Sequence, residues 1–121
     1  MKAEKRIYVV VAATVKTLKG VITQPVGRQV AQACHAVSKL RLAPWMAKYG
    51  GPVTTIVLQA RDSAELHHVY QLAEKAKLRP VSFNDENKAV YGEWDPSTAF
   101  AFLSTRPEID GIADYLPIWG S

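Results

Sequence analysis

Hydrophobic residues follow two different spacings along this chain, and these spacings predict its strands and helices. The β-branched run over residues 7–14 is typical of a strand that is buried on both faces. Apolar residues at helical spacing predict one helix over residues 27–42 and a second helix over residues 62–77. Shorter strand-like runs cover residues 53–60, 80–83 and 98–104.

Residues that favour turns and helix ends separate these segments. Pro44 disfavours helical backbone just before it, so it predicts the end of the first helix. Asp62, followed three residues later by Glu65, resembles a capping box at the start of the second helix. Irregular or loop structure is expected over residues 15–26 and 84–96, and a short helical turn over residues 108–113.

The order of these elements, strand, helix, strand, helix, strand and strand, predicts the fold class. Crossover connections of this kind place helices against a sheet. We therefore expect a compact α/β sandwich in which helices flank a four-stranded mixed, largely parallel sheet. A length of 121 residues, of which 48% are hydrophobic and 21% charged, indicates one globular domain over residues 1–121.

Two features of the sequence bear on location and cofactors. The longest apolar run, over residues 7–13, is far shorter than the ~20 residues of a membrane-spanning helix. It also follows too little positive charge for a secretory signal, so a cytoplasmic location is expected. Cys34 is the single cysteine, so neither an internal disulfide nor a thiolate zinc site is expected.

Basic residues are concentrated in the first half of the chain. Residues 1–60 hold nine Lys and Arg against one acid, whereas residues 61–121 hold six against ten acids. Six of the basic residues fall in the first helix or beside it, namely Lys16, Lys19, Arg28, Lys39, Arg41 and Lys48. A surface of this kind attracts phosphates and favours nucleic acid as a partner, although a merely solubilising face is the alternative.

The first predicted helix carries polar and apolar residues in separate stripes. At spacings of i, i+4, i+7 and i+11, the polar stripe consists of Arg28, Gln32, His35 and Lys39. The apolar stripe consists of Val30, Ala33, Val37 and Leu40. We therefore expect one face of this helix to pack against the core and the other to be available for chemistry.

Three residues of the polar stripe could take part in ester hydrolysis. His35 has an ordinary pKa near neutrality, which suits a general base or acid, although a single helical histidine is more often structural. Arg28 lies in the first helical turn, where free backbone N–H groups already favour an anion. Gln32 could orient a water or a carbonyl. Cys34 points about 100° away from His35 and is interpreted as a small core residue.

Further candidates lie outside this helix. Asp85 and Glu86 follow the third predicted strand, at the edge of the sheet where open α/β folds place their sites, and a carboxylate there could orient His35 or activate water. A solvated loop is the alternative. Candidate platforms for unpaired RNA bases are Trp45, Tyr91 and Trp94. His67 and His68 have no metal-binding spacing, so we assign them no role and expect no metal site.

The pattern Gly-Arg-x-x-Ala-Gln-x-x-His-Ala over residues 27–36 resembles a family signature. It is similar to the Gly-Lys-x-x-Ala-Gln-x-x-His-Ala motif of peptidyl-tRNA hydrolases of the archaeal and eukaryotic type. Residues 95–103 resemble a second, weaker family segment. The resemblance implies a compact α/β fold, often dimeric, that cleaves the ester between peptide and tRNA without a cofactor. It implies catalytic roles for Gln32, His35 and Asp85.

The resemblance also implies a substrate-binding role for the basic surface, with peptidyl-tRNA as the partner. We expect tRNA contacts from Arg28, Lys39, Lys16 and Lys19. Arg28 stands where the family has lysine, and a guanidinium binds phosphate but does not act as a base. Residues 85–89 lack the glycine and threonine of the family pattern, as in a divergent bacterial or phage-type member. A non-catalytic RNA-binding module and a protein-interaction domain with an exposed tail are the alternatives.

Overall fold

Strand β1 (Lys5–Ala12) lies at the centre of the structure, a computed structural model that describes residues 4–84 and 97–120. It pairs in parallel with β4 (Thr55–Ala60) and antiparallel with β6 (Ser97–Thr105). The short strand β5 (Val81–Asn84) pairs antiparallel with the other side of β6, so the order in the sheet is β4-β1-β6-β5. The predicted four-stranded mixed sheet is confirmed.

Strand β6 runs against the other three strands of this sheet. The sheet therefore contains one parallel pair of neighbours, β1 with β4, although β1, β4 and β5 all point in the same direction. Their carboxyl ends lie at one edge, together with the start of β6. The chain returns to this edge before it begins the first helix. The Gln24 N–H donates to the carbonyl of Ala13, the residue that follows β1, at 2.8 Å.

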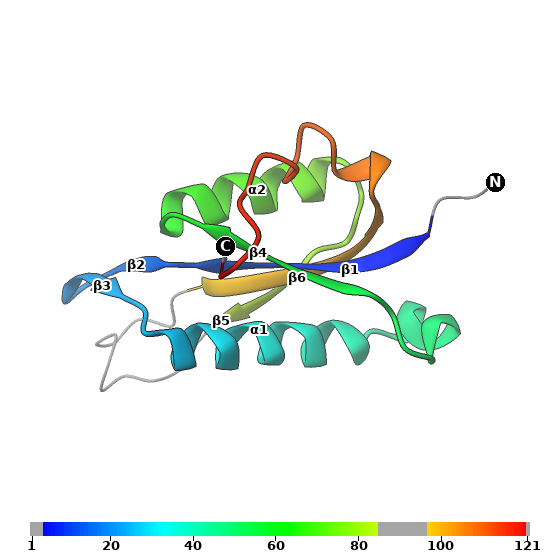
Figure 1. Ribbon diagram of the computed structural model, residues 1–121, viewed down its shortest axis with the longest axis horizontal. Helices are drawn as coiled ribbons and strands as arrows, with labels where there is room; N and C mark the ends of the chain where they lie inside the picture. The colour runs from blue at the N-terminus through cyan, green and yellow to red at the C-terminus, as the bar shows by residue number, and fades with distance from the viewer. Residues whose placement is uncertain (1–3, 85–96, 121) are drawn as a thin grey trace.

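Helices cover both faces of the sheet, as the two-sided burial of β1 requires (Figure 1). Helix α1 (Val26–Arg41) packs on the face that presents Ile7, Val9 and Val11. Helix α2 (Ser63–Lys75) and the C-terminal segment pack on the face that presents Tyr8 and Val10. No helix within residues 4–84 and 97–120 is long and apolar enough to cross a membrane.

The ends of the helices follow the predicted signals. Helix α1 ends at Arg41, and Pro44 begins the 3-10 helix η1 (Pro44–Tyr49). The Arg41 guanidinium donates to the carbonyls of Tyr49 and Gly51, at 2.6 and 3.2 Å, and thereby ties η1 back to the helix. At the start of α2, the Asp62 carboxylate accepts from the Glu65 N–H at 2.9 Å, which confirms the predicted cap.

Residues 14–23 form a hairpin, which corrects the prediction of irregular structure. Strands β2 (Thr14–Thr17) and β3 (Gly20–Thr23) pair antiparallel with each other and stand apart from the main sheet (Figure 1). Gly20 has a φ of 102°, a backbone conformation that L-residues rarely adopt, so it permits the tight turn. The prediction took Gly20 and Pro25 as signs of irregular structure and overlooked the β-branched residues on both sides of the glycine.

The buried face of α1 differs from the predicted apolar stripe. Its buried residues are Gln29, Gln32, Ala33, Ala36 and Leu40. Val30 is 44% exposed, and Cys34 is exposed as well, so the prediction of both as inward-facing residues is wrong. The helix has few large apolar side chains, so small alanines and two glutamines with hydrogen-bond partners determine which face turns inward.

The C-terminal residues extend the sheet beyond β4. The Gln59 N–H donates to the Pro117 carbonyl and the Trp119 N–H to the Val57 carbonyl, both at 2.9 Å. The Trp119 indole N–H also donates to the Gln29 Oε1 at 2.8 Å, and the Gln59 amide donates to the same atom. The tail therefore covers the edge of β4 within its own chain, so residues 117–119 are part of the fold.

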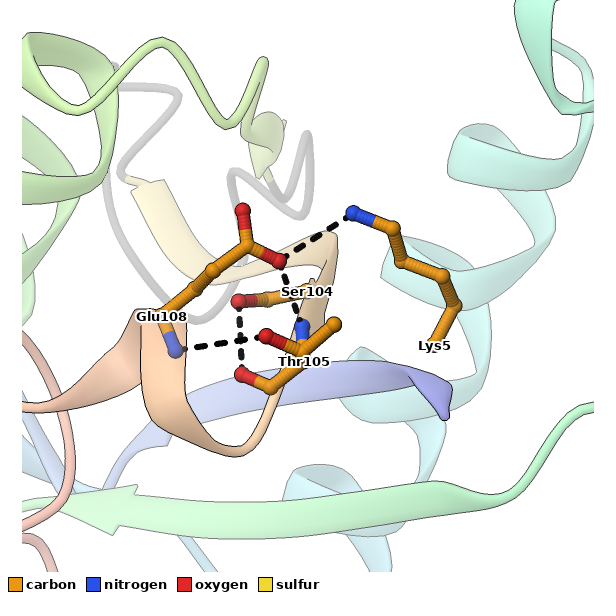
Figure 2. A network of polar contacts seen from close by, with 4 residues as sticks. All are labelled: Lys5, Ser104, Thr105 and Glu108. Carbon is orange, nitrogen blue, oxygen red and sulfur yellow. Dashed lines mark hydrogen bonds and ion pairs between the residues drawn. The ribbon is translucent and has the colours of Figure 1, made fainter. Parts of the chain in front are cut away.

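A second polar network lies at one end of the β1–β6 pair, where the start of β1 meets the end of β6 (Figure 2). The Glu108 carboxylate, in the 3-10 helix η2 (Pro107–Ile109), accepts from the Thr105 N–H at 2.9 Å, and the Glu108 N–H donates to the Thr105 hydroxyl at 3.3 Å. Lys5 pairs with the same carboxylate at 3.1 Å. The Thr105 amide and the Lys5 ammonium hold the pKa of Glu108 below its ordinary value, against the opposing effect of partial burial.

Replacing Glu108 with alanine should lower the free energy of unfolding near neutral pH by roughly 1 kcal/mol, as for other lost capping interactions. Because folding lowers the pKa of Glu108, its carboxylate stabilises the fold above the ordinary carboxyl pKa and loses this effect as the pH falls through the folded pKa. The difference from wild type should therefore shrink below about pH 4.3. Urea unfolding at a series of pH values measures it. Asp110→Ala is the control, and a loss for Glu108→Ala that is equal at all pH values would contradict the prediction.

Candidate functional site

His35 lies on the exposed surface of α1 and is held there by an aromatic contact. Its imidazole stacks on the Phe83 ring of β5, with ring centroids 4.9 Å apart and planes 23° from parallel. Phe83 is half-buried, and His35 remains exposed. The stacking fixes the orientation of the imidazole and leaves the side chain accessible to a substrate.

Gln32 is buried one turn before His35, with 2% of its surface exposed. Its Oε1 accepts a hydrogen bond of 2.9 Å from the hydroxyl of Thr98, a fully buried residue of β6. The β5–β6 pairing shifts register between Phe83 and Asn84, which leaves Thr98 unpaired with β5 at this irregularity. Since the carbonyl end of the Gln32 amide accepts from Thr98, its NH₂ end is the donor.

Two basic residues complete the stripe at its two ends. The Lys39 ammonium donates to the Ser82 carbonyl of the edge strand β5 at 2.9 Å. Arg28 lies half-buried in the first turn of α1. Three of the four residues of the polar stripe contact β5 or β6, so the stripe is partly an interface with these strands. The prediction that this whole face is available for chemistry is corrected accordingly.

The two lysines of the β2–β3 hairpin lie elsewhere. Lys16 is exposed, and its N–H donates to the Ser63 hydroxyl at the start of α2, 2.8 Å away. Lys19 lies in the hairpin turn, where its N–H donates to the Thr17 hydroxyl. Lys16 borders a cavity of about 430 Å³ on the α2 side of the sheet, so the structure separates it from the α1 stripe.

This cavity contains residues that the sequence analysis did not select. It is lined by Lys16, Ser63, Leu66, His67, Tyr70, Ser82, Asn84 and Ser97. His67, to which no role was assigned, faces it from α2 one turn before Tyr70. Burial, and to a lesser extent the nearby Glu74 carboxylate, raises the pKa of Tyr70. The spacing of 63, 67 and 70 on one helix face was the signal available in the sequence.

Phe83 and Thr98 are the residues of the α1 site that the sequence analysis missed. Alternation in the third strand, with apolar residues at 81 and 83 and polar ones at 82 and 84, indicated that Phe83 faces a helix. The register irregularity beside Thr98 leaves no comparable pattern in the sequence, so the contact of Thr98 with Gln32 could not be predicted. Asp85, Glu86, Tyr91 and Trp94 lie outside the described residues.

Comparison with known proteins shows that the fold of this chain is similar to that of a solved structure. No family model matches this chain, and no curated protein matches it. A solved structure of a protein of unknown function from Agrobacterium tumefaciens strain C58 is similar, with a TM-score of 0.65 and 13% sequence identity. The match covers 97% of this chain and 98% of the other. The chain therefore shares its architecture with that protein over nearly its whole length.

Proposed function

We propose that this protein hydrolyses the ester bond between peptide and tRNA in peptidyl-tRNA, in the cytoplasm and without a cofactor. One observation carries the proposal. An exposed imidazole, held by Phe83, lies one turn of α1 from a buried amide whose carbonyl oxygen Thr98 holds. The helical motif of the sequence predicted His35 and Gln32 as partners, and these contacts give each a fixed geometry.

Ester hydrolysis requires an activated water and a donor for the charge that develops on the carbonyl oxygen. His35 acts as general base toward the water, because its imidazole is accessible and histidine is the side chain most often used for proton transfer in catalysis. The Gln32 NH₂ group is assigned to the carbonyl oxygen, where a donor stabilises the transition state once the residues that bury the amide yield. Asp85, which follows Asn84 directly in the sequence, is assigned the role of holding the tautomer of His35.

The phosphates of the tRNA are assigned to the basic residues around this pair. Arg28 lies one turn before Gln32, and its guanidinium can contact two phosphate oxygens at once. Lys39 lies one turn after His35, so Arg28 and Lys39 flank the proposed reaction centre along α1. Lys16 and Lys19 lie on the hairpin, apart from the α1 stripe, and are assigned to more distant phosphates.

A non-catalytic RNA-binding module is the second candidate. The burial of Gln32 favours it, since an amide that is 2% exposed reaches a substrate only if the surrounding residues yield. Arg28 in place of the family lysine favours it as well.

The homodimer implied by the resemblance remains part of the proposal. It is supported by three exposed apolar side chains on the hairpin and at the start of α1, namely Leu18, Val21 and Val26.

Substituting His35 with alanine should lower the rate of peptide release by about 100-fold or more, because the general base is lost. Binding of tRNA should change little. The measurement is release of labelled peptide from purified peptidyl-tRNA, with tRNA affinity determined in parallel. His68→Ala, at an exposed histidine of α2, is the matched control and should leave both quantities unchanged. Equal rates for His35→Ala and wild type would exclude His35 as the base.

Replacing Thr98 with valine keeps the shape of the side chain and removes the donor to Gln32. The buried Oε1 then loses this partner, so the free energy of unfolding should fall by about 1–2 kcal/mol. Because the amide is no longer held, kcat for peptide release should fall about tenfold or more. KM should stay within about twofold, since phosphate contacts are untouched. A loss of stability with unchanged kcat would show that Gln32 is structural.

Arg28→Glu should weaken tRNA binding about tenfold at low salt, because it removes a phosphate contact and adds repulsion. Lys75→Glu, at an exposed position of the last turn of α2, should change it far less. Arg28→Lys restores the family residue and should retain binding. If wild type binds tRNA, and neither wild type nor Arg28→Lys releases peptide, the binding module replaces the esterase.

A further inference from the structure

A second basic site lies at the far end of β5, away from the start of α1. It is a pocket of about 270 Å³ between the start of β1, η1, the turn that precedes β5 and the end of β6. Four cationic side chains line it, namely Lys5, Lys48, Lys77 and Arg79. Glu108 is its acidic lining residue and is already paired with Lys5 at 3.1 Å. The positive charge of the pocket therefore exceeds the negative.

Aromatic rings lie beneath two of these cations. The Arg79 guanidinium lies over the Trp45 ring, 5.4 Å from its centroid, and the Lys48 ammonium lies over the Tyr49 ring at 5.4 Å. A flat guanidinium held on an indole offers a surface on which a nucleic-acid base can stack. Cations interleaved with aromatic rings are the pattern that single-stranded nucleic acid recognises.

The backbone at this pocket holds lysine and arginine where glycine would fit better. Lys77 has a φ of 61° and Arg79 a φ of 54°, both in the left-handed region. Lys77 follows the end of α2 in a glycine-type cap, in which its N–H donates to the Glu74 carbonyl and the Leu78 N–H to the Ala73 carbonyl, at 3.0 and 3.1 Å. The chain thus keeps two cations on a strained turn that faces the pocket.

We propose that this pocket binds the phosphates and a base of a single-stranded RNA segment. The inference rests on the RNA-binding part of the proposed function and does not depend on hydrolysis. The volume is below the ~300–1,000 Å³ of small-molecule sites, which favours a strand that passes over the pocket. Arg28 and Arg41 are separated by about 20 Å of helix, so one RNA can contact both ends of α1.

The test uses Lys77→Gly, a substitution that removes a cation and at the same time suits the left-handed backbone. Affinity for a fluorescein-labelled single-stranded RNA of about ten nucleotides is measured by anisotropy over a range of salt concentrations. We expect Kd to rise about three- to tenfold at low salt. The negative slope of the logarithm of the association constant against the logarithm of the salt concentration should become shallower by about 0.7, because one phosphate contact is lost. The melting temperature should stay equal or rise, which separates lost binding from lost folding.

Control variants and competitors make the result specific. Lys75→Ala removes the same charge outside the pocket and should leave Kd within about twofold, whereas Lys48→Ala should weaken binding as Lys77→Gly does. Wild-type affinity in Lys77→Gly and Lys48→Ala, or no binding of the RNA by wild type, would overturn the inference. Competition by polyglutamate as strong as by unlabelled RNA would overturn it in favour of an acidic protein partner.

The peptide-release assay keeps this inference distinct from the proposed function. Lys75→Ala, outside the pocket and on the other helix from His35, should keep the wild-type kcat at saturating peptidyl-tRNA. If His35→Ala has no effect on release while Lys77→Gly weakens RNA binding, the esterase fails and the pocket assignment stands. If His35→Ala abolishes release while Lys77→Gly binds RNA as wild type does, the esterase stands and the pocket assignment fails.

Discussion

The two-sided burial of β1 is the constraint on which the rest of the structure depends. Every side chain from Ile7 to Ala12 is buried, so both faces of the strand must be covered. Helix α1 covers one face, and α2 with the C-terminal segment covers the other (Figure 1). The start of α1 is thereby brought to the carboxyl end of β1, and its surface comes to lie along β5 and β6.

Two buried glutamines determine how α1 is rotated on this sheet. Gln29 accepts from Trp119 and Gln59 and donates to the Gln24 carbonyl, and Gln32 accepts from Thr98. A buried amide without these partners would cost about 1–3 kcal/mol, so the helix has one favourable rotation. That rotation sends the next polar positions of the stripe toward β5. The residues that hold the fold and those proposed for catalysis are thus neighbours on one helix, which makes the geometry of the site a consequence of core packing.

The basic half of the chain divides into groups with different uses. Arg41 is engaged with the carbonyls of η1, and Lys39 with the edge of β5, so part of the positive charge secures the fold. The basic residues expected to form one surface are instead divided between the hairpin, α1 and a pocket beside η1. The proposed RNA would have to extend past the end of α1 to contact the pocket as well as Arg28.

The sequence by itself determined the central strand, both main helices, the Asp62 cap and the four-stranded α/β class, because these depend on short-range spacing and local hydrogen bonds. Only the tertiary structure decided the hairpin beside β1, the reversed β6 between β1 and β5, and the inward rotation of Gln32. The physical reason lies in sequence separation. Gln29 meets Trp119 across 90 residues, and Gln32 meets Thr98 across 66 residues. A buried glutamine resembles a surface glutamine until its distant partner is in place.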